Sequence, residues 1–191
     1  HLHVPIQSAS DTVLRRMRRK YTMAEFGERI TRLKEVLPDC AITSDVIVGF
    51  PGETEEEFME TFNFINDHKF SELHVFPYSK RTGTPAAMMD DQVEESIKEE
   101  RVARLIALSD QLAKEYASKY EGELLEIIPE EFSEEAGGRL VGYTDNYLRV
   151  AIEGDESMIG QLVRVKITKA GYPMNDGQFV RIMQTLKDAA V

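Results

Sequence analysis

The first 77 residues of the chain alternate between short apolar stretches and longer amphipathic ones. Apolar runs at 2–7, 41–48 and 72–78 predict strands, and they lack the regular alternation of a half-exposed sheet, which is typical of parallel strands covered by helices. Between them, 22–37 and 54–68 carry helical patterns that each open with a capping box, Thr22 with Glu25 and Thr54 with Glu57. These are βα units, so the fold class is α/β.

A different pattern follows. From Asp91 to about Tyr120, apolar residues recur at three- and four-residue spacing, which predicts one long amphipathic helix. Five short strands are then expected at 124–128, 139–144, 147–153, 162–168 and 178–183, separated by turns that contain Gly, Asn or Asp. They predict a small antiparallel β-barrel. The expected organisation is a βα part (1–90), a connecting helix (91–120) and a barrel (121–191).

Composition limits the function classes. The chain has 191 residues, a net charge of −11 and no apolar run or leader that indicates a membrane or secretion signal, so we expect a cytoplasmic protein with no membrane contact. The single cysteine, Cys40, excludes a disulfide framework and any site with three or four thiolates within this chain. A parallel sheet that begins at His1 leaves an open edge, and we therefore expect a piece of a longer protein whose N-terminal region is missing.

The stretch "VIVGFPGETEEEF" joins the second predicted strand to the second helix. It resembles a phosphate-binding turn but lacks the Gly-Lys-Ser ending, and Glu53 and its neighbours would repel phosphate. Gly49 and Gly52 permit close backbone approach, and Asp45 can accept hydrogen bonds from hydroxyls, so the turn suits a ribose or an adenine. A tight βα turn with a helix cap and no ligand is the other interpretation.

Histidines and basic residues leave further alternatives open. His1 and His3 share one face of a strand, which would suit a metal-dependent barrel hydrolase, but structural histidines are favoured and no metal site is predicted. The run from Arg15 to Lys20 would be gathered by a short helix after the first strand, either as a solvated face or as a carboxylate or phosphate site.

Three stretches, "HLHVPIQSASDTVLRRMRRKYT", "TSDVIVGFPGETEEEF" and "FPYSKRTGTPAA", together resemble the second half of the radical S-adenosylmethionine barrel of the tRNA methylthiotransferases. The last part resembles their TRAM domain, an OB-like barrel. The resemblance implies a partial βα barrel of TIM type with S-adenosylmethionine across the carboxyl ends of the strands. It further implies that Arg19 pairs with the methionyl carboxylate, Asp45 accepts from ribose hydroxyls and Gln7 contacts the methionyl or ribose part. The implied cofactor contacts are Gln7, Ser8, Arg19, Asp45, Val48, Gly49, Pro51, Gly52, Phe76, Pro77 and Tyr78.

The chemistry implied by the family is cleavage of S-adenosylmethionine by one 4Fe-4S cluster and sulfur delivery by a second, before methylation. The cysteines that bind both clusters are absent here, so the chain is expected to contain no catalytic residue and to be inactive by itself. "FPYSKRTGTPAA" and "AGYPMNDGQFV" look most like the branch that modifies threonylcarbamoyl-adenosine beside the anticodon. The isopentenyl-adenosine branch, the ribosomal-protein branch and a non-catalytic RNA-binding module are the alternatives.

The TRAM resemblance implies that tRNA is the partner. Arg164 and Lys166 are two residues apart, so they leave the same face of a strand and predict a basic surface, whereas the acidic stretch 121–136 must face elsewhere. The predicted RNA contacts are Arg149, Arg164, Lys166, Lys169, Arg181, Tyr143 and Tyr147.

Overall fold

The computed structural model describes residues 1–184 and divides into two compact units, one formed by Leu2–Leu112 and the other by His1 and residues 113–184. Helix α4 (Glu95–Ser118) contributes to both units. Each unit has its own apolar core, and each is described separately below.

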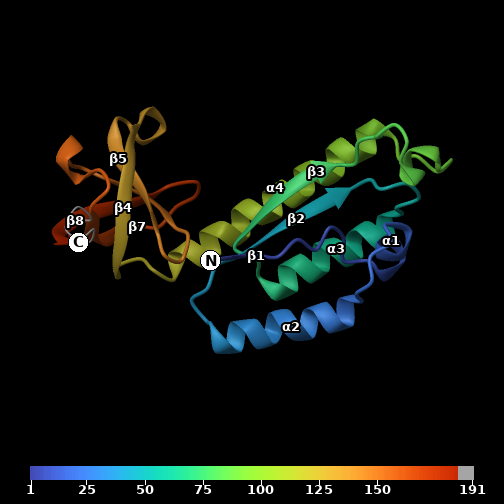
Figure 1. Cartoon of the computed structure of the whole chain (residues 1–191), viewed down its shortest axis with the longest axis horizontal. Coiled ribbons are helices and arrows are strands. Elements are labelled where there is room, and N and C mark those ends of the chain that lie inside the picture. Colours follow the sequence, from blue (N-terminus) through green and yellow to red (C-terminus); the bar gives the residue numbers. More distant parts are fainter. Residues whose placement is uncertain (185–191) are drawn as a thin grey trace. The chain divides into compact units, whose positions relative to one another are not determined.

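A three-stranded parallel sheet forms the centre of the first unit (Figure 1). Its strands are β1 (Leu2–His3), β2 (Ile42–Val48) and β3 (Glu72–Pro77), in the order β1-β2-β3. β1 is shorter than the predicted 2–7, because Pro5 has no N–H for the ladder and pairing with β2 resumes only as an isolated bridge at Gln7. The parallel sheet and its strand order support the predicted α/β fold.

The helices of this unit begin where the sequence predicts. α2 (Met23–Val36) and α3 (Glu55–His68) both have the expected capping boxes, at Thr22 and at Thr54. Apolar residues of α2, α3 and α4 share one buried cluster with the strands, so all three helices cover the same face of the sheet. The cluster includes Ile30, Ile42, Val46, Val48, Phe58, Ile65, Leu73, Leu105 and Leu108.

Two helix boundaries differ from the prediction. α1 (Asp11–Arg16) ends before most of the basic run, and Arg18 has a left-handed backbone (φ 58°), so the short helix does not gather these cations on one face. α4 begins at Glu95 rather than Asp91, because the preceding segment packs against the turn after β2, where the Asp91 carbonyl accepts a hydrogen bond from the Gly52 N–H. A short 3₁₀ helix, η1 (Pro85–Met88), lies between β3 and α4.

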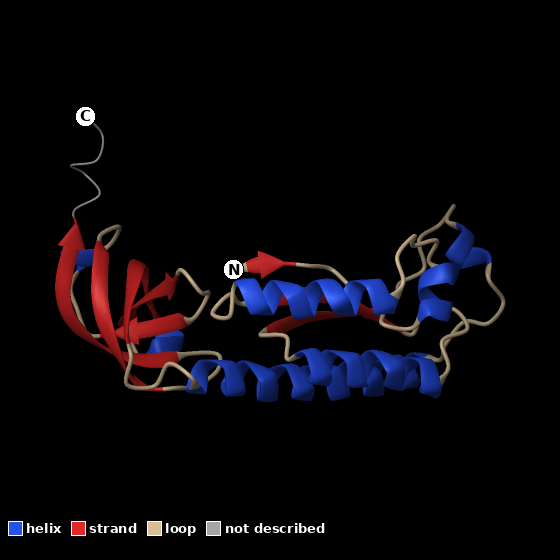
Figure 2. Cartoon of the chain, turned by 90° about the horizontal axis from the view of Figure 1, so that it is seen from below, coloured by secondary structure: helices blue, strands red, loops and turns tan. Residues whose placement is uncertain are grey.

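The second unit is a closed barrel of strands (Figure 2). The strands are β4 (Leu124–Ser133), β5 (Arg139–Thr144), β6 (Arg149–Ile152), β7 (Leu162–Lys169) and β8 (Asn175–Gln184). Their order around the barrel is β4-β5-β6-β8-β7. Neighbouring strands are antiparallel except for β6 and β8, which pair in parallel over a short register. Alternate residues point inward, and Val150, Val163 and Ile167 are fully buried. The 3₁₀ turns η2 (Glu134–Ala136) and η3 (Glu156–Met158) lie in the connections between strands.

Within residues 1–184, no helix combines the length and the apolar character that crossing a membrane would require.

Candidate functional site

The face of the sheet turned away from the helices presents polar side chains. Val46 and Val48 of β2 pack into the core, so the alternate residues Asp45 and Ile47 leave the strand on the opposite face. Gln7 is fixed beside them, because its N–H donates to the Asp45 carbonyl at 3.0 Å and its carbonyl accepts from the Ile47 N–H at 2.8 Å. Its left-handed backbone (φ 63°) turns the chain at this point. Gln7 and Asp45 thus lie on neighbouring segments, and their roles as cofactor contacts stay predictions.

A pocket of about 260 Å³ opens at the carboxyl ends of these strands. Tyr78 contributes a buried hydroxyl for which the described residues offer no hydrogen-bond partner, and its ring packs edge-on against Phe50 at 5.3 Å between centroids. A buried hydroxyl without a partner is uncommon in proteins and suits a site where a ligand supplies the missing bond. The pocket is lined by Gln7, Arg16, Met17, Arg18, Arg19, Ile47, Phe50, Tyr78, Thr84, Pro85, Ala86 and Met89.

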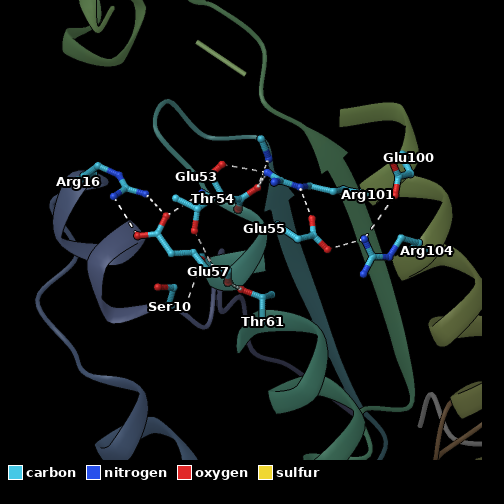
Figure 3. A network of polar contacts seen from close by, with 12 residues as sticks. Ser10, Arg16, Glu53, Thr54, Glu55, Glu57, Thr61, Glu100, Arg101 and Arg104 are labelled. Atoms are coloured by element: carbon cyan, nitrogen blue, oxygen red, sulfur yellow. Dashed lines mark hydrogen bonds and ion pairs between the residues drawn. The ribbon is translucent and has the colours of Figure 1, made fainter. Parts of the chain in front are cut away.

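The acidic residue that closes the turn after β2 points into the protein. The Glu53 carboxylate accepts from the Gly49 N–H at 2.6 Å and from the Arg101 guanidinium at 2.7 Å, and both side chains are almost completely buried (Figure 3). Burial raises the pKa of Glu53, opposed by the Gly49 N–H and by Arg101. Since Gly49 has a left-handed backbone (φ 71°), this glycine and this ion pair together fix the shape of the turn.

A second ion pair holds Arg16, the last residue of α1, against α3. Arg16 makes two hydrogen bonds with Glu57, at 3.1 and 2.6 Å, and Glu57 also caps α3 through the Thr54 N–H (Figure 3). Burial raises the pKa of Glu57, but the bonds from Arg16 and Thr54 outweigh it and the net shift is downward. Arg16, Arg18 and Arg19 all line the pocket, but Arg16 is committed to Glu57, which leaves Arg18 and Arg19 as the candidates for a ligand carboxylate.

Two histidines flank Asp45, an arrangement that sequence reasoning missed. His3 Nε2 lies 3.3 Å from Asp45 Oδ2, and His74 is the register partner of Asp45 on β3. The sequence had associated His3 with His1, its neighbour on the same strand. A prediction of the parallel register between β1, β2 and β3 would have revealed the cluster, because the register places residues of the three strands side by side.

The other predicted cofactor contacts differ in accessibility. Ser8 is fully buried and lies 3.3 Å from the Thr61 hydroxyl, and Val48 faces the helices, so neither side chain lines the pocket. Phe76 is half exposed on the polar face of the sheet, and Pro77 is exposed at the end of β3. As cofactor contacts these residues stay predictions, as do Pro51 and Gly52, which form the turn that Glu53 closes. Met89 and residues 84–86 also line the pocket and were not predicted as contacts, since turn and 3₁₀ residues carry no periodic signal.

The outer face of the barrel carries the predicted RNA contacts on neighbouring strands. Arg164 and Arg181 are cross-strand partners on β7 and β8, and Lys166 leaves the same face of β7 as Arg164. Tyr143 and Tyr147 stack with their ring centroids 5.2 Å apart. Lys169 ends β7.

Acidic side chains already neutralise part of this face. Arg164 pairs with Glu126 at 2.5 Å, and Arg149 pairs with Glu135 at 3.1 Å, so two of the predicted cations have carboxylate partners within the unit. The prediction that the acidic stretch 121–136 faces away from the basic residues is therefore wrong in part. The reason is that β4, which belongs to this stretch, lies between β5 and β7 in the barrel. A pocket of about 470 Å³ on this face is lined by Leu124, Leu125, Glu126, Ile127, Ile128, Tyr143, Thr144, Asp145, Leu162 and Arg164.

Comparison with known families agrees with both units. Residues 1–65 match the radical SAM superfamily, and residues 118–171 match the TRAM domain. A solved structure of coproporphyrinogen III oxidase (HemN) from Escherichia coli is similar over 58% of this chain and 26% of its own, with 22% identity and a TM-score of 0.49.

Curated relatives match along nearly the whole chain. The threonylcarbamoyladenosine tRNA methylthiotransferase MtaB of Bacillus subtilis is 72% identical over 186 residues, which are 96% of this chain and 41% of that protein. A tRNA-2-methylthio-N(6)-dimethylallyladenosine synthase of Thermoanaerobacter sp. is 41% identical over 96% of this chain and 39% of its own length. The chain thus spans about two fifths of the length of these relatives. It therefore contains a segment of the radical SAM superfamily and a TRAM domain, and it is similar along nearly its whole length to these two relatives.

Proposed function

We propose that this chain is part of a tRNA methylthiotransferase that adds a methylthio group to threonylcarbamoyl-adenosine beside the anticodon. The observation that carries the proposal is the identity of 72% to the B. subtilis enzyme of that name, against 41% to a relative named for dimethylallyladenosine. Both matches cover the same share of this chain, so the difference in identity is a like-for-like comparison and favours the threonylcarbamoyl branch.

The first unit is proposed to hold S-adenosylmethionine, and the residues present fit that molecule. Its ribose diol needs a hydrogen-bond acceptor, which the half-exposed Asp45 carboxylate offers. Its carboxylate needs a cation, which Arg19 offers at the pocket, and the buried hydroxyl of Tyr78 can take up a polar group of the ligand. Because the Glu53 carboxylate is bound to the Gly49 N–H and to Arg101, its negative charge is compensated and does not repel the carboxylate of the cofactor.

S-adenosylmethionine would supply both the deoxyadenosyl group for hydrogen removal and the methyl group of the product. The iron–sulfur clusters implied by the family do not fit this chain, which has one cysteine where a 4Fe-4S cluster typically needs several thiolates. The proposed contribution of the chain is therefore to bind and orient the cofactor and the RNA, in a protein that also supplies the cluster ligands.

The second unit is proposed to bind the tRNA. The basic residues Arg164, Lys166 and Arg181 lie on adjacent strands, and the stacked pair Tyr143 and Tyr147 offers ring surface to a nucleobase. The ion pair between Arg164 and Glu126 limits the net positive charge of this face, which predicts weak binding by the unit alone. A cytoplasmic location, where tRNA is found, is part of the same proposal.

Nucleoside analysis of tRNA tests the proposed substrate. Total tRNA from a strain that lacks the gene for this protein is digested and compared with wild-type tRNA by mass spectrometry. We expect loss of the methylthio derivative of threonylcarbamoyl-adenosine and accumulation of its unmodified precursor, with methylthio-dimethylallyladenosine unchanged as the internal control. Loss of the dimethylallyl derivative instead would assign the protein to the other branch, and an unchanged nucleoside profile would refute a role in tRNA methylthiolation.

A further inference from the structure

Three side chains on the polar face of the sheet converge from three different strands. His3 comes from β1, Asp45 from β2 and His74 from β3, and the ligand atoms of all three lie within 4.8 Å of one another. His3 and His74 are exposed and Asp45 is half-buried, so the cluster is open to solvent. None of these atoms belongs to the pocket lined by Arg19 and Tyr78.

The spacing of the cluster matches that of ligands around a small divalent ion. Bonds of about 2.0–2.2 Å in a tetrahedral zinc site place neighbouring ligand atoms about 3.3–3.6 Å apart. His3 Nε2 and Asp45 Oδ2 are already 3.3 Å apart, and the exposed His74 side chain can rotate to complete the triangle. Two imidazoles and one carboxylate favour zinc or cobalt over magnesium or calcium, which prefer oxygen ligands.

A fourth residue orients the first ligand. His3 Nδ1 lies 3.0 Å from the Thr43 hydroxyl, so this nitrogen has its own hydrogen-bond partner and Nε2 is directed towards Asp45. Histidines that bind metals usually have such a partner at the second ring nitrogen, because the bond fixes the ring and the tautomer. Thr43 and Asp45 are two residues apart on β2, so the strand geometry itself keeps the support and the ligand on one face.

We infer that His3, Asp45 and His74 form a binding site for a divalent transition-metal ion such as Zn²⁺. With three protein ligands the ion keeps a position open for water or another small ligand. The ion would bind the Asp45 carboxylate, which the proposed function assigns to the ribose of S-adenosylmethionine. The ion and S-adenosylmethionine would therefore compete for Asp45. The site itself is independent of the proposed function, because its residues and geometry do not involve the cofactor.

Titration of the purified chain with Zn²⁺, followed by calorimetry, and with Co²⁺, followed by visible absorption, tests the inference. We expect one ion per chain, with affinity lowered more than about tenfold in His74→Ala and in Asp45→Asn, since even supporting residues are worth about 10- to 100-fold. His1→Ala is the matched control and should bind as the wild type does, which separates this site from a chelate of the neighbouring His1 and His3. All variants are checked for unchanged circular dichroism, and His74 is exposed, so its removal leaves the core intact.

Three results would overturn the inference. The first is no saturable binding by the wild-type chain. The second is equal affinity of the wild type and a folded His74→Ala or Asp45→Asn variant. The third is loss of binding in His1→Ala, which would place the ion at the N-terminal residues instead.

Discussion

Arg101→Met tests whether the buried ion pair with Glu53 holds the turn after β2. The Arg101 side chain is 5% exposed and that of Glu53 is 1% exposed, so the substitution leaves a buried carboxylate whose remaining partner is the Gly49 N–H. Removing one partner of a buried pair costs about 3–5 kcal/mol. Because the Gly49 bond stays, we expect a loss near the lower end, about 3 kcal/mol in the free energy of unfolding at neutral pH.

The loss should depend on pH in a direction fixed by Glu53. Burial already raises the pKa of this carboxyl in the folded protein, and removal of Arg101 raises it further. The folded state then binds a proton more readily than the unfolded state, so protonation relieves the buried charge. The destabilisation is therefore full at neutral pH and decreases as the pH falls through the raised pKa of Glu53.

Urea unfolding of the first unit, followed by circular dichroism of its helices, measures these differences. Arg104→Met is the matched control, because Arg104 is one third exposed and pairs with Glu55 and Glu100 on the surface, where such pairs contribute about 0–1 kcal/mol. The double variant Glu53→Gln with Arg101→Met should be more stable than Arg101→Met alone, since glutamine is neutral and still accepts from Gly49. A loss below about 1 kcal/mol for Arg101→Met, or no rescue by Glu53→Gln, would refute this account of the turn.

Three further predictions follow from the two units. Thr54→Ala should lower the free energy of unfolding by about 1 kcal/mol in urea titrations, because it removes the side-chain cap of α3; a loss of only a few tenths would show that the cap contributes little. Replacement of Arg164 and Lys166 together by Glu should weaken tRNA binding and make it less sensitive to salt. The slope of log affinity against log salt should become less negative by about 0.7 for each contact with single-stranded RNA that is lost. Arg29→Glu with Arg32→Glu, an equal change of charge on α2, should have a smaller effect, and equal effects would deny the barrel face a specific role. Reconstitution of the purified chain with iron and sulfide should leave it colourless, and absorbance of about one 4Fe-4S cluster per chain would contradict the proposal that the cluster ligands lie elsewhere.

The elements of the fold were predictable because their signals are local. Capping boxes at Thr22 and Thr54 mark helix starts within a few residues, and apolar runs mark the strands that the helices cover. The failures occur where a distant contact decides the local structure. The segment that begins at Asp91 is not helical, because the Asp91 carbonyl accepts a hydrogen bond from Gly52, which is far away in the sequence. The first strand ends early because Pro5 cannot donate to the sheet.

The candidate site was less predictable than the fold. A family resemblance, not periodicity, pointed to Gln7 and Arg19, whereas Asp45 was also indicated by its position before the turn that contains Gly49 and Gly52. The structure places Gln7 and Arg19 in one pocket and Gln7 beside Asp45. The cluster of His3 and His74 around Asp45 depends on the register between strands, which no single stretch of sequence encodes. Likewise, the pairing of Arg164 with Glu126 follows from barrel topology, so the sequence overstated the free positive charge of that face.

Binding of S-adenosylmethionine to the purified chain tests the central claim most directly. Ligand-observed NMR titration suits this measurement, since without the cluster the affinity is expected to be weak. We predict saturable binding by the wild-type chain, reduced about 10- to 100-fold in Asp45→Asn and in Arg19→Ala, because each loses a charge-assisted hydrogen bond of about 1.5–3 kcal/mol. Arg15→Ala, on the exposed side of α1, is the control and should bind normally. No binding by the wild-type chain, or equal binding by all four proteins, would contradict the assignment of this sheet to the cofactor.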